Sequence, residues 1–318
     1  MRGYIWRRTL FAVVTVFLAL TLNFVLFRVL PGDAATRLSR VPNASPEMVQ
    51  ALERQFGLDL PLWEQYVRYL QQLAHGNMGI SFANRQPVVD NLLEAFGNTI
   101  PMVTTGVLMS IVLGTLIGVF SAVRRGTVGD HILTNTSVVF YAFSTQFLGI
   151  VLLILFAGIL PSAGMSDPFA AILSPWEQFL DVARHMILPV VTLTLTLTAE
   201  TVLIVRSAML ETLGEDYIFT ARAKGLRRGR IIRSHAFRNA SLPTVTQIAL
   251  SLGSIVSGSI LVEVIFSWPG VGRALYDAVL QRDFPMLQGG FLVITITVVL
   301  VNYIADLLYF RLDPRVSR

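Results

Sequence analysis

The sequence predicts an all-α polytopic membrane protein, and three observations lead to this fold class. Of the 318 residues, 53% are hydrophobic and only 14% are charged, whereas an ordinary soluble domain carries about 25% charged residues. The mean hydropathy is +0.63. Several apolar stretches reach the roughly 20 residues that a helix needs to cross a bilayer. The same composition excludes a disordered chain, and the lack of cysteine excludes a disulfide-stapled domain and thiolate chemistry.

Six apolar stretches are predicted to span the membrane as helices. They cover residues 9–30, 99–122, 131–160, 186–206, 242–266 and 287–310. The third is too long for one untilted span, so we place its apolar centre at 138–160. In the fourth, threonines at every second position from Thr192 to Thr198 give a strand period. We overrule it, because a lone strand leaves its backbone groups unpaired in lipid.

The distribution of basic residues predicts the orientation of these spans. An even number of spans places both termini on one side, together with residues 123–130 and 207–241. The segments on that side hold 15 Lys and Arg in 59 residues, whereas those on the opposite side hold 8 in 113. Because Lys and Arg in short loops mark the cytoplasmic side, we expect cytoplasmic termini. The net charge of +5 then reflects topology and requires no nucleic-acid partner.

The first external segment, residues 31–98, is too long for a simple connection and is predicted to be a helical insertion after the first span (1–30). Helix start and stop signals flank residues 45–57. A second, amphipathic helix follows Pro61 and carries three aromatic residues, Trp63, Tyr66 and Tyr69. We favour an aromatic cap at headgroup depth. A docking platform for an external protein is the alternative.

The segment 207–241 is the most informative part of the chain. Leu213, Tyr217 and Ala221 are spaced as one face of a helix. Small residues follow, which let another surface approach the backbone closely: Ala221, Ala223 and Gly225. Gly225 also suits the left-handed end of a helix. Such a helix can transmit force from a cytoplasmic partner, and the alternative is an ordinary basic loop with a glycine cap.

Charged residues within the apolar stretches are few, and each costs roughly 2.5–3.5 kcal/mol at the centre of a span. Glu200 lies deepest, and a pathway role and structural pairing are equally open for it. Arg206 and Glu263 lie nearer the span ends and are candidates for the pathway or for interhelix polar contacts. The second span has small residues at every fourth position from Gly106 to Ala122, which predicts close packing within the subunit.

The segment from Tyr217 to Gly225 resembles the cytoplasmic loop of bacterial ABC-importer permeases of the dipeptide, oligopeptide and nickel branch, in particular the first of its two permease subunits. Other pieces agree in order and spacing along nearly the whole chain. They are Leu30-Pro31-Gly32-Asp33, Gly57-Leu58-Asp59-Leu60-Pro61, Gly79-Ile80-Ser81-Phe82, Ile187-Leu188-Pro189, Phe266-Ser267-Trp268-Pro269-Gly270-Val271-Gly272 and Leu312-Asp313-Pro314-Arg315. Phe219 and Thr220 depart from the Glu-Ala of the wider importer pattern, which argues against a sugar importer.

The resemblance implies six transmembrane helices of the type I ABC-importer kind, with a permease core at 99–310 and a cytoplasmic tail at 311–318. It places the chain in the bacterial inner membrane. It further implies a second homologous permease, two cytoplasmic ATPase subunits and an external solute-binding protein as partners, besides membrane lipid. Contact with one ATPase is expected through Tyr217, Thr220, Ala221, Arg222, Ala223, Lys224 and Gly225.

Sequence motifs for catalysis are missing from this chain. It has no phosphate-binding loop, zinc-protease motif or nucleophile elbow. We therefore expect a transport subunit that is not an enzyme and binds no cofactor or metal, with ATP and Mg used by the partner ATPases. Di- and oligopeptides are the expected solutes, with nickel chelates, glutathione or another small solute as alternatives. A secondary transporter, which typically shows internal repeats and midplane ionisable groups, is a distant alternative.

Overall fold

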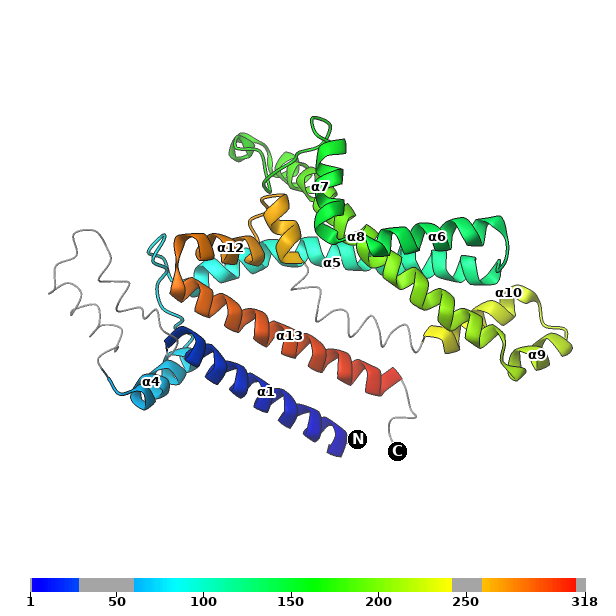
Figure 1. Ribbon diagram of the computed structural model, residues 1–318, viewed down its shortest axis with the longest axis horizontal. Helices are drawn as coiled ribbons and strands as arrows, with labels where there is room; N and C mark the ends of the chain where they lie inside the picture. Colours follow the sequence, from blue (N-terminus) through cyan, green and yellow to red (C-terminus); the bar gives the residue numbers. More distant parts are fainter. Residues whose placement is uncertain (1, 29–59, 242–258, 313–318) are drawn as a thin grey trace.

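The computed structural model describes residues 2–28, 60–241 and 259–312, and within them the chain forms helices and no strand (Figure 1). Most of the predicted fifth span, the helix predicted at 45–57 and the end of the tail lie outside the described residues. The helices are α1 (Arg2–Arg28), α4 (Leu62–Ala74), α5 (Val88–Val123), α6 (Val128–Ala142), α7 (Thr145–Leu155), the 3₁₀ helix η1 (Ala170–Ile172), α8 (Pro175–Leu213), α9 (Asp216–Ala223), α10 (Arg228–Arg230), the π-helix η2 (Ile231–Ala236), α12 (Val271–Gln281) and α13 (Phe284–Leu312).

Four helices are long and apolar enough to cross a membrane, and they coincide with the first, second, fourth and sixth predicted spans. They are Ile5–Phe27, Val88–Val123, Pro175–Leu213 and Phe284–Leu307. The second and third of these have 36 and 39 residues, which at 1.5 Å per residue gives about 54 and 58 Å. Because the hydrocarbon core is about 30 Å thick, α5 and α8 extend beyond it. The all-α polytopic prediction is confirmed.

The third predicted span is divided into two helices. α6 and α7 meet at an angle of 103°, and Figure 1 shows α7 pointing away from the line of α6. The hydroxyl of Ser144 accepts a hydrogen bond from the backbone N–H of Phe147 at 3.3 Å and so caps a new helix start. The prediction of one continuous apolar helix at 138–160 is therefore wrong, because the chain turns inside it.

α5 packs against α8 along a row of glycines. A Cβ atom on Gly114 would lie 2.5 Å from Cβ of Thr201, and one on Gly118 would lie 2.8 Å from Cβ of Val205. Real Cβ atoms do not approach so closely, so only glycine permits this separation of the two backbones. The predicted close packing of the second span within the subunit is confirmed.

The alternating threonines of the fourth span are helical, as predicted. The hydroxyl of Thr192 donates to the carbonyl of Leu188 at 2.8 Å, and that of Thr196 donates to the carbonyl of Thr192 at 3.0 Å. These bonds reach back one helical turn and satisfy the hydroxyl groups within the helix.

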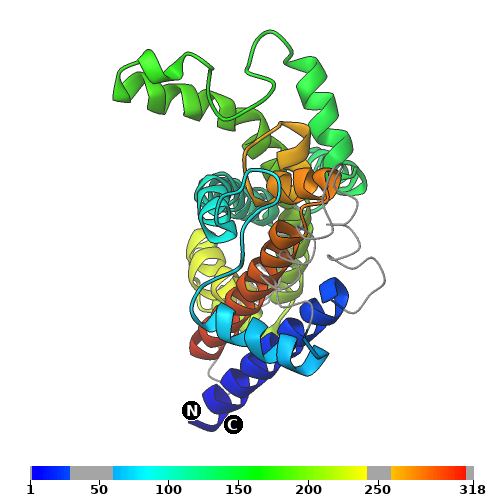
Figure 2. The same cartoon turned by 90° about the vertical axis from the view of Figure 1, so that its left-hand side faces the viewer.

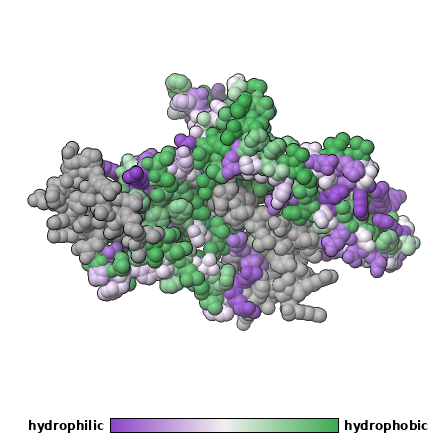
Figure 3. Space-filling view, viewed as in Figure 1, coloured by the Kyte–Doolittle hydropathy of each residue, from purple (hydrophilic) through white to green (hydrophobic). Residues whose placement is uncertain are grey.

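α1 and α13 lie side by side and antiparallel (Figure 2). Thr9 and Tyr303 share a hydrogen bond of 2.8 Å between their hydroxyl groups, and Arg8 forms an ion pair of 3.0 Å with Asp306. Figure 3 shows hydrophobic side chains over the middle of the molecule and hydrophilic ones over the end formed by α9 and α10. This polar end carries the segment that the sequence singled out.

Candidate functional site

The segment after α8 forms a short helix between two turns. α8 ends at Leu213, and α9 spans Asp216–Ala223. Gly225 has a φ of +73°, and the N–H of Leu226 donates to the carbonyl of Ala221 at 3.3 Å. This is the left-handed helix end that the sequence predicted. The chain then turns into α10 and η2.

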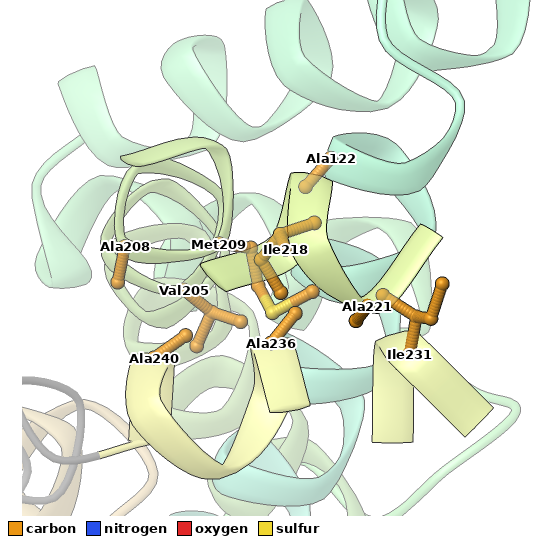
Figure 4. Close-up of a cluster of buried hydrophobic side chains, with 9 residues drawn as sticks. All are labelled: Ala122, Val205, Ala208, Met209, Ile218, Ala221, Ile231, Ala236 and Ala240. Atoms are coloured by element: carbon orange, nitrogen blue, oxygen red, sulfur yellow. The ribbon is translucent and has the colours of Figure 1, made fainter. Parts of the chain in front are cut away.

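One face of α9 belongs to a hydrophobic core. Ile218 and Ala221 are buried against side chains of α5, α8 and the segment after α9 (Figure 4). The cluster, called the coupling core below, consists of Ala122, Val205, Ala208, Met209, Ile218, Ala221, Ile231, Ala236 and Ala240. This packing joins α9 to the ends of α5 and α8.

The predicted inner face of this helix was partly wrong. Ala221 is buried, as the spacing of Leu213, Tyr217 and Ala221 required, but Tyr217 is 39% exposed and Ile218 takes its place. The physical reason is that α8 stops at Leu213 and a turn precedes α9. The helical spacing of α8 therefore cannot be extended past Leu213 to predict which residues of α9 are buried.

The opposite face of α9 is exposed. Phe219 is 55% exposed, and the guanidinium of Arg222 lies over its ring at 5.6 Å. Of the predicted contact residues, those on this side are Tyr217, Thr220, Arg222, Ala223, Lys224 and Gly225. The Tyr217 hydroxyl accepts a hydrogen bond of 2.8 Å from Asn239, which joins α9 to the chain beyond η2. The face offers an aromatic ring, two cations and small residues to another molecule.

Arg206 makes an interhelix polar contact, one of the two roles left open for it, with a partner that the sequence did not indicate. Its guanidinium donates two hydrogen bonds, of 2.8 and 3.0 Å, to the two carboxylate oxygens of Asp130 at the start of α6. Asp130 is 1% exposed and also accepts from Ser121, from Thr134 at 3.1 Å and from the N–H of Gly126 at 3.0 Å. We call Ser121, Asp130, Thr134 and Arg206 the ion-pair cluster.

Glu263 is fully buried and holds the start of α12. Its oxygens accept hydrogen bonds from the Thr99 hydroxyl at 2.8 Å and from the N–H groups of Gly272 at 2.6 Å and Arg273 at 3.2 Å. This is an interhelix polar contact, one of the two roles left open for Glu263. The Phe-Ser-Trp-Pro-Gly-Val-Gly motif that follows it is the turn leading into α12.

Glu200 lies half-buried in α8, and among the described residues it makes no ion pair and no side-chain hydrogen bond. Arg206, six residues further on, pairs with Asp130 instead. The pathway role of Glu200 stays a prediction.

The three external aromatic residues differ in their surroundings. Tyr66 shares a hydrogen bond of 2.7 Å with Thr21, and Tyr69 donates to Asn23 at 3.2 Å, so both face α1. Trp63 is 69% exposed. Among the three, only Trp63 presents its ring to lipid or to an external protein.

Within the described ranges, no group of three or more His, Asp or Glu side chains is placed to hold a metal ion. The face of α9 opposite the core is exposed. The exposed side chains of α9 can form apolar contacts through Phe219 and charge pairs through Arg222.

Comparison with known proteins agrees with these features. The family model described as "Binding-protein-dependent transport system inner membrane component" matches residues 114–318, and the model of its N-terminal region matches residues 1–103. The chain is 38% identical over 336 residues to the dipeptide transport system permease protein DppB of Escherichia coli K12, and 38% identical over 333 residues to the di/tripeptide transport system permease protein DppB of Pseudomonas aeruginosa. Each alignment covers 99% of both chains.

A second kind of relative and a solved structure were also found. The glutathione transport system permease protein GsiC of Escherichia coli is 33% identical over 319 residues, with 99% of both chains covered. A chain of the inward-facing MetNI methionine ABC transporter superimposes with a TM-score of 0.55 at 18% identity. That match covers 70% of this chain and 96% of the other and shows a shared fold. The chain belongs to the family of inner membrane components of binding-protein-dependent transport systems.

Proposed function

We propose that this chain is one of two permease subunits of an ATP-driven importer of di- and oligopeptides. It lines the pathway together with a second, similar permease. Two cytoplasmic ATPase subunits use ATP and Mg, and an external solute-binding protein delivers the solute. The chain itself binds no cofactor and catalyses no reaction. The similarity to two DppB proteins supports peptides as the solute, and the weaker similarity to GsiC makes glutathione the second candidate.

The observation that carries this proposal is the two-sided character of α9. Its inner side chains, Ile218 and Ala221, belong to the coupling core. Its outer side exposes Phe219 and Ala223, and Gly225 is exposed just beyond its end. A partner that grips the outer side moves the inner side, and with it the packed ends of α5 and α8.

The mechanism proposed is alternating access. ATP binding brings the two ATPases together and draws the docked helices with them. The permease pair then opens to the outside and accepts solute from the binding protein. Hydrolysis lets the ATPases separate, and the pair returns to the inward-open state.

The docking step is tested by changing the exposed face of α9 alone. Ala223→Trp places a large ring on this face, and Ala74→Trp, at the exposed end of α4, is the matched control. We expect Ala223→Trp to abolish co-purification of the ATPase and uptake, while Ala74→Trp leaves co-purification intact. Ala223→Cys should also form a cross-link to the ATPase with a short bifunctional reagent. Normal ATPase binding and uptake by Ala223→Trp would overturn the docking proposal.

The energy source and the solute are tested with the complete complex in proteoliposomes. We expect uptake of a labelled dipeptide that requires ATP, the ATPases and the binding protein, and less uptake of glutathione. Uptake by this chain alone, driven by a proton gradient, would instead identify a secondary transporter.

Glu200 is proposed to line the pathway, because it carries a half-buried carboxylate without an ion pair in the described structure. Glu200→Gln keeps the size and removes the charge. We expect several-fold slower uptake at an equal amount of assembled complex, measured as initial rate per ATPase bound. Unchanged uptake would remove Glu200 from the pathway.

A further inference from the structure

The ion-pair cluster connects three elements next to the coupling core. Arg206 belongs to α8, Ser121 to the last turn of α5, and Asp130 and Thr134 to the first turns of α6. Both carboxylate oxygens of Asp130 are bound by the planar guanidinium, which fixes direction as well as distance. The cluster thus holds the turn between α5 and α6 to α8.

The same turn is held a second time, by the coupling segment, our name for residues 214–241, which contain α9, α10 and η2. The guanidinium of Arg228, in α10, donates a hydrogen bond of 2.8 Å to the carbonyl of Val123, the last residue of α5. Beside this contact, an open groove of about 580 Å³ is lined by parts of α5, α8 and the coupling segment, with Leu213, Arg222 and Ile232 in its wall. The Arg228 contact therefore joins the turn to the coupling segment at the edge of this groove.

The cluster does more than attract two opposite charges. The Asp130 side chain is 1% exposed and that of Arg206 is 24% exposed, so part of the attraction is offset by the cost of removing the carboxylate from water. What the pair adds is a fixed geometry between elements that lie far apart in sequence. Asp130 and Arg206 are separated by 76 positions.

We infer that Asp130 and Arg206 are a positioning pair for transport, which makes the α5–α6 turn, the end of α8 and the coupling segment move as one body when the ATPases close. The inference rests on the proposed function, since it assumes that α9 receives the movement. Neither residue needs to touch solute or ATP. Without the pair, the turn is joined to the moving elements only by the Arg228 contact and the packing of Ala122, and it follows their movement less closely.

The test uses the complete reconstituted complex and three variants. Arg206→Lys keeps the charge but loses the two-pronged contact. Asp130→Asn leaves Arg206 without its counter-charge. The double variant Asp130→Asn with Arg206→Gln removes both charges together, so that no buried charge is left unpaired and assembly is retained.

We expect the double variant to assemble and to keep the basal rate of ATP hydrolysis. Its uptake, and the stimulation of its hydrolysis by solute-loaded binding protein, should fall about tenfold or more, and Arg206→Lys should show the same loss. A pair with a merely structural role predicts wild-type uptake per assembled complex in the double variant. That result would overturn the inference.

A distance measurement gives an independent readout. The chain has no cysteine, so Val128→Cys at the turn and Ser234→Cys in η2, both exposed, give a unique pair of spin-label sites in this subunit. We expect one distance, unchanged between the ADP and ATP states, in an otherwise native chain, and a nucleotide-dependent distance in the double variant. A distance that changes with nucleotide in the native background would also overturn the inference.

Failure of the proposed function gives a different pattern. In that case the Ala223→Cys cross-link to the ATPase is missing from the otherwise native complex. If the cross-link forms and the double variant transports normally, only the positioning pair is wrong.

Discussion

The Glu263 carboxylate does the work of a helix cap from outside the helix. The residue before α12 is Gly270, which has no side chain to cap it, and a Cβ there would lie 2.5 Å from the Glu263 carboxyl carbon. Glu263 instead accepts the N–H groups of Gly272 and Arg273. These free N–H groups of the first turn are the ones that a Ser or Asp cap usually satisfies.

Glu263→Met should therefore destabilise the protein. Both backbone N–H groups donate to the same carboxylate oxygen, so a Gln amide oxygen could still accept them, whereas Met keeps a similar size and removes both acceptors. A buried donor left unsatisfied costs about 1–3 kcal/mol, and we expect a lower melting temperature of the purified complex. Glu94→Met, at an exposed position of α5, is the control and should melt as the native protein does. Equal melting of both variants would contradict the capping role.

Gly225 permits a second prediction about a single residue. Its left-handed φ costs a residue with a side chain about 1–2 kcal/mol, and Asn tolerates it better than Val. No atom lies within 4 Å of a Cβ placed there, so only the backbone conformation is at issue. Gly225→Val should reduce ATPase co-purification and uptake, while Gly225→Asn stays near the native level. Equal behaviour of the two variants would contradict a conformational requirement at this position.

At the level of elements, the contact between α5 and α8 sets the position of the coupling core, because both helices end in it. Gly114→Ala should force the helices apart, since its Cβ would lie 2.5 Å from that of Thr201. Overpacking of this kind typically costs about 1–3 kcal/mol. Gly97→Ala in the same helix is the matched control, with no atom within 4 Å of the new Cβ. The amount of folded protein in the membrane and its melting temperature measure the difference, and equal loss in both variants would refute the packing argument.

The sequence predicted elements well where the signal was local. The long apolar runs, the helix end at Gly225 and the row of glycines in α5 each depend on neighbours within a few residues. The break at Ser144 also had a local signal, since serine is a common helix start, but the apolar run on both sides of it concealed the turn. The inner face of α9 was misplaced because helix spacing does not continue across the turn after Leu213.

The sequence indicated Arg206 and Glu263 as candidates for interhelix contacts, but it could not predict the partners of either residue. Asp130 and Arg206, or Thr99 and Glu263, meet only after distant helices have packed, and a single sequence carries no record of such pairs. From the sequence, Asp130 was one residue of a loop, and Arg206 was a candidate for an interhelix contact whose partner could not be named. Their burial is a property of the tertiary structure.

For the whole molecule, the orientation is open to direct measurement. The basic end that contains α9 and α10 is expected in the cytoplasm, with α4 on the other side of the membrane. A membrane-impermeant maleimide should label Trp63→Cys in intact spheroplasts and Ser234→Cys only after permeabilisation. The native chain, which has no cysteine, provides the blank. The reverse labelling pattern would refute the assigned topology.

α8 runs unbroken through 39 residues, from the segment before Pro175 to the turn that leads into α9. Because one continuous helix extends past both faces of a bilayer, binding at one end of the helix is coupled to binding at the other end. Any ligand on one side that prefers one tilt of this helix alters, by an equal free energy, the affinity of whatever grips its other end. Binding of solute on one side can therefore change the affinity for the partner on the other side through α8 itself.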